Sequence, residues 1–455
     1  MAGTATAEPS AARPQEAGAG GRGFPPSSRL PAPIQTLGVV ARPVPFFEWC
    51  RRRYGETFTL RVLRAGELVF ISDPPSLKRL FGADRRNTIA PGRNVVLRPI
   101  LGDRSLLLQE GEEHLRRRKL MLPPFHGERM RAYEAVMSRA TNREIDSWPV
   151  GSEFKLHPSM QAITLEVILS AVFGVEEGAR RDSLRANLIG ILATTRSPAA
   201  IGMTIDRMRR LPRYRRVAEM IATADRILFE EIAERRADPH LSDREDILSM
   251  LVAARFEDGS EMNDAELRDQ LMTLLMAGHE TTATGLAWAF DLLFRAPEKL
   301  DRLHDEVAGD RGTAYLDAVI RETLRLRPVV PFVGRQLREA AELGGYDLAP
   351  GTIVMPAIYL THTRPDVYPR PYEFRPERFL DGGPDTFGWL PFGGGTRRCI
   401  GAAFAELEMR VVLSTILRRA TLRAASEKAE RMVRRNVTLS PRGGTPAILV
   451  ERRQR

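Results

Sequence analysis

Cysteine is nearly absent from this chain, which contains only Cys50 and Cys399 among 455 residues. Two cysteines cannot build a disulfide framework, and these two form no CxxC pair of the kind that structural zinc sites use. Long apolar runs are also absent, since no window offers about 18 uninterrupted apolar residues. The first 29 residues contain no apolar core of the kind a signal peptide needs. We therefore expect a cytoplasmic protein with no membrane span.

Lysine is scarce as well, so the 68 basic residues and the net charge of +10 come almost entirely from arginine. The sequence has no helix-turn-helix, zinc-finger or aromatic-basic pattern, which argues against binding of nucleic acid. An arginine bias with abundant alanine is typical of a GC-rich genome. The alternative is that the basic excess helps to dock an acidic protein partner.

The pattern of apolar and turn residues predicts a mainly α protein with small β-sheets, an α+β fold class. Residues 1–29 are expected to be a disordered tail, and residues 30–455 a single domain that acts as a monomer. Helices are predicted at 46–54, throughout much of 111–263, and at 315–326. Short strands are predicted at 57–62 and 67–71. The Gly443-Gly444 turn within residues 437–450 predicts a C-terminal hairpin.

The longest helical pattern runs over residues 264–294, and Asn263 with Glu266 is suited to cap its start. Its second half is apolar on nearly all faces, which predicts a helix that crosses the core. Gly278 and Glu280 interrupt that pattern. A helix-interior glycine costs about 1 kcal/mol relative to alanine, and a carboxylate among apolar side chains needs a partner. The segment is therefore either a functional site or a satisfied polar pair in the core.

The second unusual segment is a glycine-rich turn at residues 392–401 that contains Cys399 and leads into a helical run from Ala402, with the sequence FGGGTRRCIG. A thiolate before a helix is stabilised by the free N–H groups and the dipole of that helix. Such a thiolate suits a haem iron, which needs one strong donor from the protein. The alternative is a structural cysteine buried in a turn.

The spacing of five residues in this turn resembles the haem-binding signature of the cytochrome P450 family: Phe392, Gly395, Arg397, Cys399 and Gly401. Residues 277–282, AGHETT, are similar to the acid-alcohol segment of that family's central helix. Residues 316–328 and the FRPERF segment at 374–379 resemble two further family segments. The resemblance spans roughly residues 25–450, and only a short link near residues 306–314 departs from it.

The resemblance implies the cytochrome P450 fold, a triangular helix-rich body with a long central helix over haem b. Cys399 would be the axial ligand of the iron, and Glu280 and Thr281 would deliver protons. Glu322, Arg325 and Arg378 would form a buried structural triad. The remaining cofactor-binding residues would be His114, Arg118, Ala277, Gly278, Arg335, Phe392, Gly393, Arg397 and Gly401. Many relatives have tryptophan at the position of His114.

The implied activity is that of a monooxygenase, which inserts one oxygen atom of O2 into a small apolar substrate such as a fatty acid, terpene or steroid. Electrons would come from a ferredoxin and its reductase, because the sequence has no GxGxxG fingerprint and no ferredoxin cysteine pattern. Peroxide-driven or isomerase-type chemistry and a non-catalytic haem sensor are the alternatives. The face behind the thiolate is expected to carry Arg116, Arg117, Lys119, Arg398 and Arg410.

The substrate pocket is expected to have walls from several separated segments. These are residues 85–101, 184–214, the apolar flanks of the central helix, 329–333 and the Gly443 turn. Their content of aliphatic residues and phenylalanine is the reason to expect an apolar substrate.

Overall fold

The structure is a computed structural model that describes residues 23–83, 88–89, 97–127, 129–174, 178–195, 212–435 and 437–454. Its α-helices are α1 Ala32–Ala41, α2 Pro43–Tyr54, α3 Pro74–Gly82, α5 Arg98–Leu101, α6 Gly111–Met121, α7 Arg129–Ser147, α8 Leu156–Phe173, α9 Ala179–Thr195, α10 Pro212–Arg236, α11 Ile247–Ala253, α12 Asp264–Leu293, α13 Pro297–Ala308, α14 Ala314–Leu326, α15 Ile358–His362 and α16 Ala402–Arg419. Short 3-10 turns occur at η1 Pro123–Phe125, η4 Leu241–Asp243, η5 Pro376–Phe379 and η6 Gly395–Arg397.

Within the described residues, the strands are short and fall into four sheets. They are β1 Thr57–Val62, β2 Gly66–Ile71, β3 Thr88–Ile89, β4 Glu153–Lys155, β5 Arg335–Leu337, β6 Ala341–Leu343, β7 Tyr346–Leu348, β8 Ile353–Pro356, β9 Ala420–Ala424, β10 Met432–Arg435, β11 Thr438–Pro441 and β12 Pro446–Arg452. The largest sheet has the order β1-β2-β8-β5-β3, and the others are β4-β12-β9, β10-β11 and β6-β7. The predicted class, mainly α with small sheets, is confirmed.

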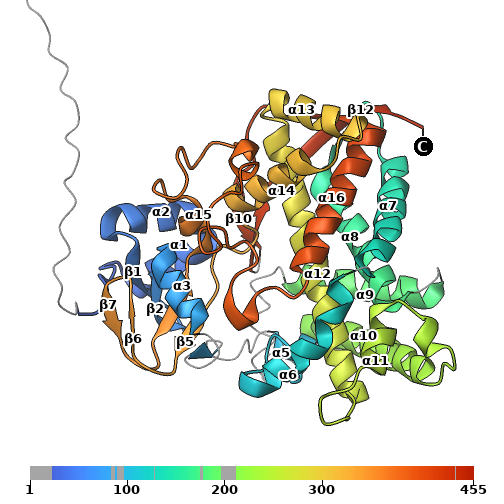
Figure 1. Cartoon of the computed structure of the whole chain (residues 1–455), viewed down its shortest axis with the longest axis horizontal. Helices are drawn as coiled ribbons and strands as arrows, with labels where there is room; N and C mark the ends of the chain where they lie inside the picture. The colour runs from blue at the N-terminus through green and yellow to red at the C-terminus, as the bar shows by residue number, and fades with distance from the viewer. Residues whose placement is uncertain are drawn as a thin grey trace, which may run out of the picture.

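The central helix α12 forms where the sequence predicts it, and it ends one residue earlier than expected. Asn263 accepts from the Glu266 N–H at 3.0 Å, and the Glu266 carboxylate accepts from the Asn263 N–H at 3.0 Å, so the capping box is complete. Nearly the whole helix is buried. Helices gather around it on one side of the body, and the strands β1, β2 and β5 lie with α1–α3 on the other (Figure 1).

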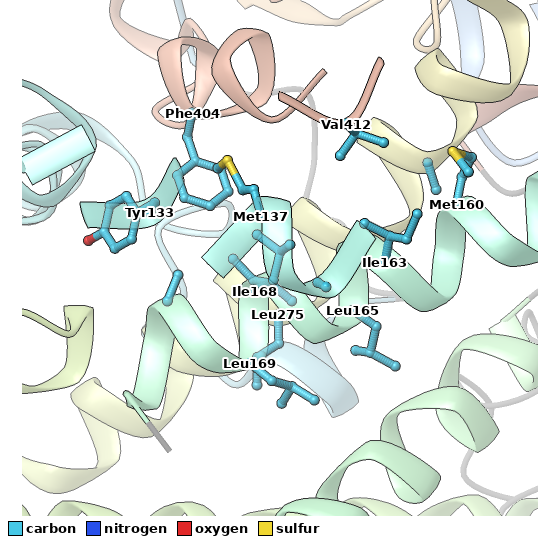
Figure 2. Packing of buried hydrophobic residues seen from close by; sticks show 14 of the residues in the cluster. Tyr133, Met137, Met160, Ile163, Leu165, Ile168, Leu169, Leu275, Phe404 and Val412 are labelled. Carbon is cyan, nitrogen blue, oxygen red and sulfur yellow. The ribbon is translucent and has the colours of Figure 1, made fainter. Parts of the chain in front are cut away.

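The main core joins α12 to α7, α8 and α16. Figure 2 shows Met137, Ile168, Leu275 and Phe404 meeting where these helices pack. Helix α8 is the one helix among the described residues that is long and apolar enough to cross a membrane by length and composition alone. The relevant window of α8 is 67% buried within the protein, as is typical of a core helix.

The predicted hairpin over residues 437–450 is wrong. Strand β11 pairs with β10, whereas β12 pairs with β4 and β9 in another sheet. The chain diverges because the Glu430 carboxylate accepts from the Gly443 N–H at 2.8 Å and from the Thr445 N–H at 2.9 Å. The Gly444 carbonyl then accepts from the N–H of His157 at the start of α8. Long-range hydrogen bonds thus replace the local turn.

The boundary expected at residue 30 is too late. The Thr59 N–H donates to the Pro26 carbonyl at 2.9 Å, and the Ser28 N–H donates to the Thr59 carbonyl at 3.2 Å. The Thr59 hydroxyl also donates to the Pro25 carbonyl. The proline-rich entry therefore lies against β1 as part of the folded body, and residues 1–22 of the predicted tail lie outside the described residues.

Candidate functional site

The Cys399 loop turns sharply before α16. Gly393 has φ +69°, a conformation that favours glycine. The Cys399 N–H donates to the Phe392 carbonyl at 2.9 Å, which closes the loop. Burial raises the pKa of the Cys399 thiol, while the Gly401 N–H and the guanidinium groups of Arg118 and Arg398 lower it. The thiol is nevertheless accessible, because it faces a cavity.

That cavity has a volume of about 280 Å³ and lies between the Cys399 loop and α12. It brings Cys399 together with eight other predicted site residues: Ala277, Gly278, Thr281, Arg335, Phe392, Gly393, Arg397 and Gly401. Its other walls are mostly aliphatic or aromatic and include Leu274, Val329, Val330 and Val333. Three residues of the expected wall at 329–333 therefore line the cavity. Much of the two expected walls at 85–101 and 184–214 lies outside the described residues.

Gly278 packs closely against α8. A Cβ added at this position would come within 3.2 Å of Ile168 Cδ1, which is tighter than an ordinary contact. The Thr281 hydroxyl donates to the Ala277 carbonyl at 2.7 Å, one turn earlier on the same helix. This bond satisfies the hydroxyl while keeping its oxygen on the wall of the cavity. The alcohol of the predicted pair therefore stands where a ligand in the cavity could reach it.

Glu280 lies on a different side of α12 from Thr281. Its carboxylate accepts from the Gln161 side chain of α8, and its second oxygen lies 3.9 Å from His157 Nε2. The side chain is buried and faces α8. The structure thus separates the two predicted catalytic residues, since only Thr281 borders the cavity.

The polar residues of α8 were missed by sequence reasoning. His157, Gln161 and Thr164 recur with helical spacing on a largely apolar helix, and that spacing was a usable signal. The Thr164 hydroxyl forms hydrogen bonds with the ring nitrogen Nδ1 of His279 and with the His279 carbonyl on α12. These contacts give His279 a structural partner, although the sequence assigned it no role.

A second buried acid, Glu408 of α16, was also missed. Its side chain is 1% exposed, and burial raises its pKa to about 8, while a hydrogen bond with Thr282 acts in the opposite direction. Thr282 borders the cavity next to Thr281. The Thr282 hydroxyl also donates to the Gly278 carbonyl at 3.3 Å. A buried carboxyl group with a raised pKa thus lies one side chain behind the cavity wall.

Four of the residues predicted to bind the cofactor have ionisable side chains. Arg335 donates to the Gly394 carbonyl at 3.0 Å, and Arg397 donates to the Gln109 carbonyl at 2.5 Å, so both guanidinium groups are aligned at the cavity. His114 is buried on α6, and Arg118 follows it one turn later. Burial lowers the pKa of Arg118, whereas the nearby Cys399 raises it. Arg118 is therefore close to the thiol.

The three residues of the predicted triad meet at the Glu322 carboxylate. Arg325 donates to both oxygens of Glu322 at 2.6 and 2.8 Å, and both side chains are fully buried. Arg378 donates to Glu322 at 3.1 Å. His362 lies between the Arg325 carbonyl and the Leu390 N–H, which donates to its ring nitrogen at 2.8 Å. The triad is thereby connected to the start of the cysteine loop.

The expected basic face behind the thiolate is only partly correct. Arg117 is 7% exposed and pairs with Glu266 at 2.6 Å, because one side of α6 packs on the start of α12. Arg116 pairs with Asp258 at 2.5 Å, and Lys119 pairs with Glu257. Arg410 pairs with Asp317 at 2.8 Å. Arg117 was therefore wrongly expected to face solvent.

Comparison with known proteins agrees with this geometry. The family model described as cytochrome P450 matches residues 25–445. Cytochrome P450 135B1 of Mycobacterium tuberculosis is 42% identical over 94% of this chain and 91% of its own length. Cytochrome P450 138 of the same species is 37% identical over 94% and 97%. The chain therefore belongs to the cytochrome P450 family.

Solved structures show the same fold. A retinoic acid-bound cyanobacterial cytochrome P450, CYP120A1, superposes with a TM-score of 0.80 at 25% identity, covering 94% of this chain and 99% of the other. The haem domain of cytochrome P450DA gives 0.81 at 24% identity, covering 94% and 98%. The protein is thus a haem-thiolate monooxygenase with haem b as its cofactor.

Proposed function

We propose that this enzyme uses Cys399 as the axial iron ligand and hydroxylates or epoxidises a small apolar substrate with electrons from a ferredoxin and its reductase. The observation that carries the proposal is that Cys399 and Thr281 border the same apolar cavity, one from the cysteine loop and one from α12. We place the protein in the cytoplasm as a monomer. A fatty acid, terpene or steroid fits the mostly apolar walls.

The residues around the cavity fit a haem. A thiol accessible from the cavity offers one sulfur donor, and Arg335 and Arg397 present cations for the two propionates. Arg118 is close to the thiol, and His114 precedes it by one turn on α6. Ala277 and Gly278 leave space on the α12 side, and Phe392, Gly393 and Gly401 form the opposite wall. Bound haem supplies the redox chemistry of dioxygen activation, to which thiolate donation contributes.

The chain's own residues exclude water and move protons. The aliphatic walls keep the reacting region dry, which strengthens each polar interaction within it. The Thr281 hydroxyl is the proton donor at the cavity wall, and we infer that Glu280 supplies it after leaving the α8 contacts with Gln161 and His157. The proton-delivery role assigned to Glu280 and Thr281 favours dioxygen as the oxidant, because an enzyme that uses peroxide directly does not need this delivery of protons.

The proposed ligand is tested by the spectrum of the reduced carbon-monoxide complex. Thiolate-bound haem gives a strongly red-shifted band, which Cys399→Ala should abolish. Cys50→Ala is the matched control, because Cys50 is fully buried in another part of the core and its thiol pKa is raised to about 12 by burial. An intact band in Cys399→Ala would overturn the assignment.

The proposed reaction is tested by comparing three assays of the same holoenzyme on apolar substrates: ferredoxin with reductase, peroxide alone, and no donor. Product with the ferredoxin system and consumption of O2 supports the proposal. Product only with peroxide would identify a peroxide-driven enzyme, and haem binding without turnover in any assay would favour a sensor. One solved relative binds retinoic acid, so long apolar carboxylic acids belong in the first substrate set.

A further inference from the structure

The N-terminal helices form an apolar groove on the surface, far from the catalytic cavity. The groove has a volume of about 500 Å³ and is lined by side chains of α1, α2 and the residue before them: Leu30, Ile34, Leu37, Pro45, Phe46 and Trp49. Leu37 is 64% exposed and Ile34 50% exposed. Contiguous apolar surface of this kind marks a site of interaction in a folded protein.

The groove is built by close packing of the two helices. A Cβ at Gly38 would lie 2.6 Å from Phe46 Cγ, so only glycine lets the Phe46 ring rest on α1. Trp49 stacks on Phe46 with ring centroids 5.8 Å apart. On α1, the residues of the groove recur at helical spacing, with Ile34 and Leu37 facing outward while Gln35 and Val39 are buried. The apolar face is thus part of the folded structure.

Exposed arginines surround this groove. Arg42 borders it directly, and Arg52 and Arg53 follow Trp49 on the same face of α2. Arg29 precedes Leu30 in the chain and is exposed. The acidic side chains of α2 and β2 are already engaged, since Glu48 pairs with Arg51 at 2.7 Å and Glu67 with Arg61 at 3.0 Å. The apolar face therefore has a positively charged rim.

The exposed apolar surface continues onto the neighbouring turn. The Leu63 N–H donates to the Thr36 hydroxyl at 2.9 Å, which fixes the β1–β2 turn beside α1. Leu63 is 53% exposed, and Arg64 follows it in the same turn. The arrangement of an exposed apolar side chain next to an arginine thus recurs at this edge of the surface.

We infer that the α1–α2 groove and its arginine rim bind the surface of a bilayer that contains anionic lipid. Trp and Leu enter the boundary between headgroups and acyl chains, while arginines extend to the lipid phosphates.

A second copy of this chain would bring the same positive rim and be repelled. Residues 1–22 contain no leucine, isoleucine, valine or aromatic residue that could fill the groove. An apolar substrate would dissolve in the same membrane.

The experiment mixes the full-length holoenzyme with vesicles of phosphatidylcholine, with or without phosphatidylglycerol, and measures the bound fraction by flotation. Binding is expected to the anionic vesicles and to weaken as salt rises, because salt screens the arginines. Trp49 fluorescence should shift to the blue on binding. Equal binding to both vesicle types, or no binding to either, would overturn the inference.

Two variants with matched controls locate the surface. Leu37→Asp should lower the vesicle affinity at least tenfold, whereas Ile189→Asp, which alters an apolar residue of α9 that is 51% exposed, should not. Arg52→Gln with Arg53→Gln should lower affinity about fivefold for each charge removed. The control is Arg131→Gln with Arg139→Gln on α7, at the other end of the body (Figure 1). Equal losses in the controls would contradict the location.

Other occupants of the groove give distinct results. Dimerisation of the free protein that Leu37→Asp abolishes would assign the groove to a second copy. Vesicle binding that appears only after deletion of residues 1–22 would assign it to that segment. Either result would overturn the inference. All variants should keep the carbon-monoxide band of the parent protein, so failure of this test is distinguishable from failure of the proposed function.

Discussion

The arginines of the triad and the two arginines that border the cavity have different hydrogen-bond partners. Arg325 meets the carboxylate of Glu322 and the carbonyls of His362 and Pro371, with no exposed surface. Arg335 and Arg397 donate to the carbonyls of Gly394 and Gln109, and both side chains border the cavity. The first group is neutralised within the protein, which suits a structural role. The second aligns positive charge at a cavity, which suits an anionic ligand.

The largest effect is expected from Arg325→Ala. It leaves the Glu322 carboxylate fully buried with only Arg378 as a charged partner, and it should destabilise the fold by about 3–5 kcal/mol. Denaturant unfolding followed by circular dichroism measures this loss. Arg325→Lys should not restore stability, because an ammonium cannot reproduce the paired guanidinium bonds. A stable protein that loses only activity would contradict the distinction between the two groups.

The second prediction uses pH to examine the link between the triad and the loop. Burial, together with Arg325, lowers the pKa of His362 to about 3. Because the ordinary value is about 6.5, the unfolded chain binds more protons between these two pH values. The stability contributed by neutral His362 is therefore complete above about pH 6.5 and declines as the pH falls toward 3.

Replacing His362 should reduce that acid sensitivity. His362→Gln retains a donor and an acceptor without titrating, so the slope of stability against pH should decrease by at most about 1.4 kcal/mol per pH unit. Unfolding midpoints at several pH values measure the slope. His240→Gln is the control, because His240 is largely exposed in a surface pair with Asp243. An unchanged slope of stability against pH in His362→Gln would show that protonation of His362 does not contribute to the acid sensitivity of the fold.

The third prediction concerns the cavity side. Thr281→Ala removes a helix-backbone bond, so stability should change by about 1 kcal/mol or less. The yield of product per O2 consumed should nevertheless fall by roughly tenfold or more, with peroxide or water formed instead. Thr223→Ala removes the same kind of bond on α10 and should keep the yield. An unchanged yield of product per O2 consumed in Thr281→Ala would contradict the role assigned to Thr281.

The smallest effect is expected from Arg410→Ala. The Arg410–Asp317 pair joins α16 to α14 at 2.8 Å, but both side chains are about one-third exposed. Such pairs contribute about 0–1 kcal/mol because water screens them. Denaturant midpoints of Arg410→Ala and the parent protein should therefore nearly coincide. If Arg410→Ala lost as much stability as Arg325→Ala, burial would not be what distinguishes structural arginines from surface arginines in this protein.

The sequence by itself determined the features that depend on neighbouring residues. Asn263 and Glu266 cap α12 as predicted, since both lie within one turn. The glycines before Cys399 define the loop, and residues 322 and 325 of the triad share one helical face. Spacing along the chain is sufficient in these cases because the interacting groups are covalently close.

Tertiary structure alone decided which partner each buried polar group meets. Arg117 turns inward to Glu266, Glu280 meets Gln161 of α8, and Glu430 diverts the chain after β11. None of these partners is near in sequence. A buried charge or N–H group must be satisfied by whatever the packing brings close, and packing is set by helices and strands far apart in the chain.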